Sequence, residues 1–187
     1  MRAQIGCRGY RPSCLSVNDS HNVLVTCPWV RKIKEFSSHG KLIRELTLPD
    51  DVIRPRHTIQ TRENEFVVCV CGGLDDDAVH RVCKISADGS HIVRSHGGKR
   101  GSGHGQYAHW AVDDNESVFV ADFRNQRVRL LSPTLDHVRD VVSRDQLKWL
   151  PCRLCLDVQR RRLYVTVNEW HEREDDFTSG RVVVFSV

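Results

Sequence analysis

The segment Trp110-Ala-Val-Asp-Asp-Asn-Glu-Ser-Val-Phe-Val-Ala-Asp122 decides the fold of this 187-residue chain. Two short apolar runs flank a turn of acidic and small polar residues, a pattern typical of two antiparallel β-strands joined by a tight turn. The same order of apolar run, polar turn and apolar run recurs in three other segments, which span residues 15–27, 58–70 and 154–166. The chain is therefore built from a repeated β-unit.

The spacing of these units indicates the type of repeat. The first apolar residues after the four turns, Val23, Phe66, Val118 and Leu163, lie 43, 52 and 45 residues apart. Periods of about 40–50 residues with several short strands each are typical of β-propeller blades. Each unit continues with a third strand that starts at a basic residue, at 32–36, 81–85, 127–131 and 181–185. The first three units then add a turn and a fourth strand.

We therefore predict an all-β fold, a β-propeller section of about four blades that are four-stranded antiparallel sheets. The whole chain, 1–187, forms one propeller region, with blades at about 10–48, 53–98, 101–143 and 149–187. The last blade lacks a fourth strand, so the predicted ring is incomplete and the sheet edges would stay open. This predicts that the chain is a fragment of a longer protein.

The third repeat resembles an NHL repeat. It has a glycine-rich start that ends in an aromatic residue (101–107), a Val-Ala-Asp strand end at Asp122, and Asn125-Gln-Arg127 before the next strand. The resemblance implies a propeller like the C-terminal NHL domain of TRIM-family proteins, which usually has about six blades. In this motif Asp122 and Arg127 suit a structural role, because the carboxylate can accept turn N–H groups and the guanidinium can pair across strands.

Composition and cysteine usage set the broad class. Hydrophobic residues make up 40% and charged residues 28%, and the net charge is only +4. Eight cysteines lie partly in apolar strand-like runs, and neither a signal peptide nor a membrane-length apolar stretch is visible. We expect free cysteines, a cytoplasmic location and no membrane contact. Cys155 falls in the innermost strand of the fourth blade, and we expect it in the core.

No catalytic constellation is visible, so we expect no enzyme, no cofactor and no metal. The Cys152-Arg-Leu-Cys155 pair has no second pair to complete a zinc site. The ten histidines are scattered, and the expected inner strands carry no cluster of acidic residues or histidines. A metal-dependent propeller lyase or hydrolase remains an alternative that metal analysis would identify.

Basic and aromatic residues gather in the loops of one expected propeller face. The candidate binding residues are Trp29, Arg31, Arg54, Arg56, His57, Lys99, Arg100, His104, Arg124, Trp149 and Arg153. Such a mixture suits single-stranded RNA, through phosphate contacts and base stacking. The loops at 75–77 and 169–176 are acidic and would repel phosphate. We therefore expect a protein partner first, as in substrate recognition by a TRIM-like ubiquitin ligase, and RNA second. We expect no small-molecule substrate.

Overall fold

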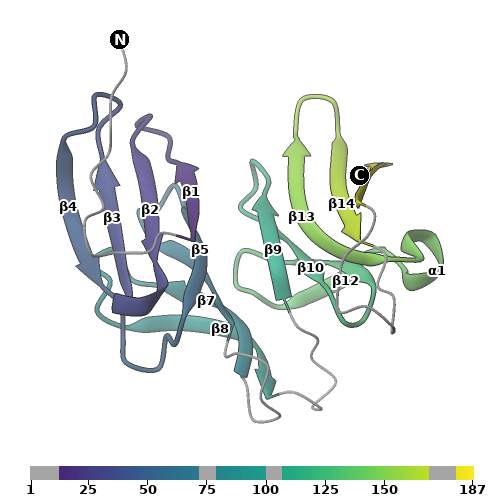
Figure 1. Cartoon of the computed structure of the whole chain (residues 1–187), viewed down its shortest axis with the longest axis horizontal. Coiled ribbons are helices and arrows are strands. Elements are labelled where there is room, and N and C mark those ends of the chain that lie inside the picture. Colours follow the sequence, from purple (N-terminus) through teal and green to yellow (C-terminus); the bar gives the residue numbers. More distant parts are fainter. Residues whose placement is uncertain (1–12, 72–78, 100–106, 169–179) are drawn as a thin grey trace. The chain divides into compact units, whose positions relative to one another are not determined.

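A computed structural model describes residues 13–71, 79–99, 107–168 and 180–187. These residues form four antiparallel sheets in which strands that are adjacent in the chain are hydrogen-bonded neighbours (Figure 1). The predicted all-β class with about four small antiparallel sheets is confirmed. No helix among these residues has the length and apolar character needed to cross a membrane.

The first half of the chain contains two of the sheets. The strands of the first sheet are β1 (Cys14–Val17), β2 (Val23–Cys27), β3 (Lys32–Phe36) and β4 (Leu42–Thr47), with the 3-10 helix η1 (Pro28–Val30) between β2 and β3. The strands of the second sheet are β5 (Pro55–Gln60), β6 (Phe66–Cys71), β7 (Val79–Ile85) and β8 (Ile92–Lys99).

The second half contains the other two sheets. The strands of the third sheet are β9 (Tyr107–Val112), β10 (Val118–Asp122), β11 (Arg127–Leu131) and β12 (His137–Val142). The short helix α1 (Arg144–Leu147) leads to the fourth sheet, with β13 (Leu150–Asp157), β14 (Arg162–Asn168) and β15 (Gly180–Ser186). The fourth sheet thus has three strands among the described residues.

The chain divides into two compact units, residues 1–99 and 100–187, and each unit has a core between its own two sheets. In the first unit, side chains such as Leu24, Ile33 and Phe66 form this core. In the second unit, Phe119 and Leu163 belong to the corresponding cluster. Burial of branched apolar side chains from two facing sheets is the main force that holds each pair of sheets together.

The turn between the first two strands is the same in all four sheets. In each, an N–H group donates to the carbonyl three residues earlier, and the donor residue has a positive φ. The donors are His21, Asn64, Glu116 and Arg161, with φ of 61°, 63°, 61° and 52°. A left-handed residue at this position lets a short hairpin keep the right-handed twist of its strands. Four equal turns are structural evidence for the repeat.

A second turn recurs between the third and fourth strands of the first three sheets. Its first residues are Ser37, Ser86 and Ser132, and each serine hydroxyl accepts an N–H from the end of the turn. The serine carbonyl accepts the N–H of a left-handed residue, which is Gly40, Gly89 or Leu135. This side-chain cap explains why the three turn sequences begin with serine.

Two local features differ from the expectations. Cys155 is exposed, because alternation along β13 directs the neighbouring Leu154 into the core and Cys155 away from it. The helix α1 was not expected from the sequence. Ser143 and Gln146 form a capping box at its N-terminus, which stabilises even this single turn.

Candidate binding surface

An exposed tryptophan marks the strongest candidate surface in the first unit. Trp29 lies in η1, directly after β2, and 65% of its surface is exposed. The Arg54 guanidinium lies over its ring, 5.4 Å from the ring centroid, within the range of a cation–π interaction. Ile53, beside Arg54 in the β4–β5 connection, is 54% exposed. We call Trp29, Arg31, Ile53, Arg54 and Arg56 the Trp29 surface.

Backbone conformation helps to present these side chains. Arg31 and Arg54 both adopt the left-handed region, with φ of 51° and 50°. A non-glycine residue in this region reverses the chain sharply, so each arginine lies at a tight bend. The N–H of Leu48 donates to the carbonyl of Arg31 at 2.8 Å, which ties the β2–β3 bend to the end of β4. The Trp29 surface therefore lies on two sharp bends, and a hydrogen bond ties the one at Arg31 to the end of β4.

The charges around this surface are partly neutralised. Arg31 forms an ion pair with Asp50 at 2.5 Å. Nearby, Arg81 pairs with the carboxylate of Asp51 at 3.2 Å. The side chain of Arg54 stacks on Trp29, and among the described residues no carboxylate pairs with it. The cationic character of the surface is therefore weaker than its number of arginines implies.

The structure removes His57 from the predicted surface. His57 lies on β5 and is only 6% exposed, whereas Arg56 before it is exposed. β5 has a register irregularity between Pro55 and Thr58, so its side chains do not simply alternate here, and His57 and Thr58 are both buried. The burial of His57 differs from the expectation of an exposed side chain, so His57 is left out of the Trp29 surface.

The second unit also has a tryptophan with an arginine stacked over its ring. The guanidinium of Arg181, at the start of β15, lies 4.5 Å from the ring centroid of Trp149, just before β13. Trp149 is half-buried and packs against the core of this unit, so its ring is less available than that of Trp29. Arg124 and Arg153 are exposed. The sequence identified a basic start to each third strand, but it did not reveal that Arg181 stacks on Trp149.

The remaining predicted surface residues cannot be placed. Arg100 and His104 lie outside the described residues. Lys99 ends β8, and nothing of its side chain is described.

Asp122, Asn125 and Arg127 of the third repeat form a hydrogen-bonded network around a buried carboxylate. The Asp122 carboxylate is fully buried and accepts hydrogen bonds from Asn125 Nδ2 at 3.0 and 2.9 Å and from Arg127 Nε at 3.0 Å. Arg127 Nη1 also donates to Asp140 on β12 at 3.0 Å. Burial raises the pKa of the Asp122 carboxyl, while the Asn125 and Arg127 hydrogen bonds oppose that rise. These contacts join β10, β11 and β12, and the buried carboxylate is inaccessible to a ligand.

Solved structures of other proteins show a similar fold. A virginiamycin B lyase from Staphylococcus aureus matches with a TM-score of 0.61 and 14% identity over 96% of this chain and 57% of that one. A streptogramin B lyase has the same score and identity, over 98% and 57% of the two chains. A protein of unknown function from Bacteroides caccae matches with a TM-score of 0.54 and 10% identity, over 93% and 61%.

This chain has a β-propeller fold. Its four meander sheets are similar to those of the solved structures above. At these sequence identities, the similarity shows the fold alone. The chain spans about three fifths of the length of these proteins. No protein-family model and no curated protein sequence matches the chain.

Proposed function

We propose that this chain is a non-enzymatic binding scaffold whose Trp29 surface contacts a protein partner. The observation that carries the proposal is the exposed Trp29 ring with the Arg54 guanidinium stacked over it. Tryptophan and arginine are the residues most enriched among those that dominate binding energy at protein interfaces. Covering the exposed part of one tryptophan removes roughly 100–150 Å² from water, which contributes about 3 kcal/mol.

The charge balance favours a protein over RNA. Arg31 has a carboxylate partner, so Arg54 and Arg56 are the two cations of the Trp29 surface for which the described residues offer no ion pair. Each phosphate contact with a single strand contributes about −0.7 to the slope of log affinity against log salt. Two contacts would give a slope of about −1.4, which is shallow for a nucleic-acid-binding surface.

We extend this proposal to substrate recognition in a TRIM-like protein. Its support is the NHL-like motif of the third repeat, with Asp122, Asn125 and Arg127 in the hydrogen-bonded network expected of a blade scaffold. Cys83, Cys152 and Cys155 carry free thiols, in accord with a reducing compartment such as the cytoplasm.

The test compares capture by two matched variants of the whole chain. The Trp29→Ala, Arg54→Ala double variant removes the stacked pair, and Val138→Ala truncates an exposed apolar residue on β12, far along the chain. Quantitative mass spectrometry of captured proteins should show specific partners that the double variant loses and Val138→Ala keeps. Equal capture by both variants would contradict the proposal.

A titration with single-stranded RNA at two salt concentrations separates the RNA alternative. We expect no binding at micromolar protein concentration in 150 mM salt. Tight binding that weakens steeply with salt, and that is lost in the Arg54→Ala, Arg56→Ala variant, would replace the protein-binding proposal with RNA binding.

The likeness of the fold to two lyases keeps one enzymatic alternative open. Elemental analysis of the purified chain tests it, because the alternative is a metal-dependent lyase or hydrolase. A stoichiometric divalent metal would overturn the proposal of a non-enzymatic scaffold.

A further inference from the structure

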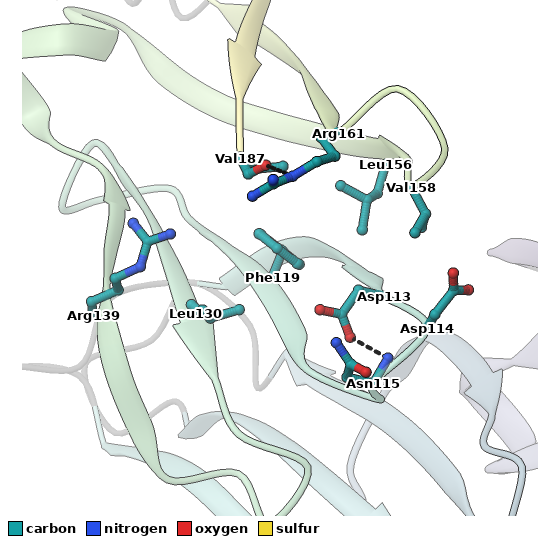
Figure 2. Close-up of a pocket in the computed structure, with 10 residues that line it drawn as sticks. All are labelled: Asp113, Asp114, Asn115, Phe119, Leu130, Arg139, Leu156, Val158, Arg161 and Val187. Carbon is teal, nitrogen blue, oxygen red and sulfur yellow. Dashed lines mark hydrogen bonds between the residues drawn. The ribbon is translucent and has the colours of Figure 1, made fainter.

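The second unit contains a cavity of about 520 Å³ that shares no residue with the Trp29 surface (Figure 2). This volume lies within the range of small-molecule sites, about 300–1,000 Å³. Its apolar lining comes from Phe119, Leu130, Leu156 and Val158. Arg139 and Arg161 supply two guanidinium groups, and Asp113, Asp114 and Asn115 lie at another part of the wall.

Strand register places three of these residues in a row. Phe119 on β10 is the register partner of Leu130 on β11, and Leu130 is the partner of Arg139 on β12. Register partners direct their side chains to the same face of a sheet. One face of the third sheet therefore offers an aromatic ring, an aliphatic side chain and a guanidinium in sequence, and Figure 2 shows all three at the cavity.

The opposite wall belongs to the fourth sheet and its first turn. Leu156 lies on β13, and Arg161 is the left-handed residue of the β13–β14 turn. Arg161 Nε donates to the carbonyl of Val187 at 3.0 Å, which ties this side chain to the residue after β15. In Figure 2 the Arg139 and Arg161 side chains extend into the cavity region from different walls.

The first sheet has the same row with one decisive difference. There Leu24, Glu35 and Arg44 are successive register partners, so Glu35 occupies the place of Leu130 and Arg44 that of Arg139. Arg44 Nε donates to Glu35 at 2.6 Å, and the pair is internally neutralised.

The third sheet keeps the arginine but replaces the carboxylate with leucine. No ion pair or hydrogen bond of the Arg139 side chain is found within residues 13–71, 79–99, 107–168 and 180–187. In the first sheet, the corresponding arginine pairs with the Glu35 carboxylate. Arg139 lies at the edge of an apolar cavity without such a neighbour on β11, so its guanidinium is suited to the carboxylate of a ligand.

We propose that this cavity binds a monocarboxylate with an apolar body. The carboxylate is held by the Arg139 guanidinium, which can donate two parallel hydrogen bonds, and the apolar body packs on Phe119, Leu130 and Leu156. The aspartates at positions 113 and 114 disfavour a polyanion such as a phosphate ester, because like charges within one cavity repel. The carboxylate can belong to a free small molecule or to the C-terminus of a peptide with an apolar last residue.

The test uses the whole chain and 4-phenylbutyrate as the probe, with 4-phenylbutan-1-ol as the uncharged probe of the same shape. Isothermal titration calorimetry should give a dissociation constant of about 1 mM or tighter for the acid, a value expected for a ligand of this size. Arg139→Gln should weaken binding of the acid by about tenfold or more. The matched control is Arg94→Gln, because Arg94 has the same register position on β8 and does not line the cavity.

A second variant transfers the arrangement of the first sheet to the third. Leu130→Glu places a carboxylate beside Arg139, as Glu35 lies beside Arg44. It should abolish binding of the acid while the circular dichroism spectrum stays that of the wild type. The proposal is overturned if the acid and the alcohol bind equally, if neither Arg139→Gln nor Leu130→Glu weakens binding, or if the acid does not bind at 10 mM.

Competition distinguishes the two sources of the carboxylate. The probes are an acetylated Gly-Gly-Phe peptide with a free C-terminal carboxylate and the same peptide as its amide. Displacement of 4-phenylbutyrate by the free acid alone supports recognition of a peptide C-terminus. Failure of both peptides, with 4-phenylbutyrate bound through Arg139, supports a small free carboxylate.

Discussion

Replacement of Asp122 by asparagine tests the buried network of the third sheet. The substitution keeps the shape of the side chain but removes the charge that accepts hydrogen bonds from Asn125 and Arg127. Breaking a buried ion pair can cost about 3–5 kcal/mol, and a hydrogen bond to a charged group contributes about 1.5–3 kcal/mol.

Two features place the expected cost near the lower value. The Arg127 side chain keeps Asp140 as a partner and is 24% exposed, so its charge is not left isolated. Burial also raises the pKa of Asp122, which means that the ionised carboxylate carries a desolvation cost that asparagine avoids. We therefore expect Asp122→Asn to lower the free energy of unfolding by about 2 kcal/mol.

Urea denaturation followed by circular dichroism measures this loss. With a denaturant dependence of about 2 kcal/mol per M, the midpoint should fall by about 1 M. The control is Asp157→Asn, which removes an exposed ion pair with Arg160 and should leave the midpoint almost unchanged. Equal shifts for the two variants would refute the role of the Asp122 network in stability.

Three further predictions follow from local environments. Burial, and then the charge of a neighbouring arginine, lower the pKa of His109 to about 4. Between about pH 4 and 6.5 the unfolded chain therefore binds a proton that the folded chain does not, so the free energy of unfolding should rise with pH by about 2–3 kcal/mol across this window. His109→Asn should flatten that rise in urea denaturation experiments. Gly89 has a φ of +78°, and an added Cβ would lie 3.2 Å from a side-chain carbon of β4; Gly89→Ala should lower the thermal midpoint, in contrast to Gly180→Ala, whose Cβ would meet its nearest atom at 3.6 Å. Burial raises the pKa of Cys83 to about 11, so iodoacetamide at pH 8 should label the exposed Cys155 and spare Cys83 until the chain unfolds, and equal labelling rates in the folded chain would contradict this.

The buried network around Asp122 shows what a local motif can reveal. The motif places an acid at the end of one strand and an arginine at the start of the next, so antiparallel pairing alone brings them opposite each other. The hydrogen bond from Arg127 to Asp140 on β12 does not follow from pairing alone, because the register places Asp140 opposite Arg129.

The binding residues show where a single sequence stops being informative. Trp29 and Arg54 lie in connections and are exposed, but their stacking depends on bends at Arg31 and Arg54, which are far apart in the chain. The burial of His57 shows the same limit, because its orientation depends on the register irregularity of β5 between Pro55 and Thr58, which the sequence does not reveal.

The sequence by itself determined the all-β class, the repeat and the positions of the strands, because side-chain alternation and turn residues act over a few neighbouring positions. Only the tertiary structure revealed the cavity beside Arg139. Its walls come from two sheets, and its character depends on Leu130 standing where another sheet has Glu35. This difference can be seen only when the strand register of the two sheets is known, because register determines which residues of neighbouring strands lie side by side.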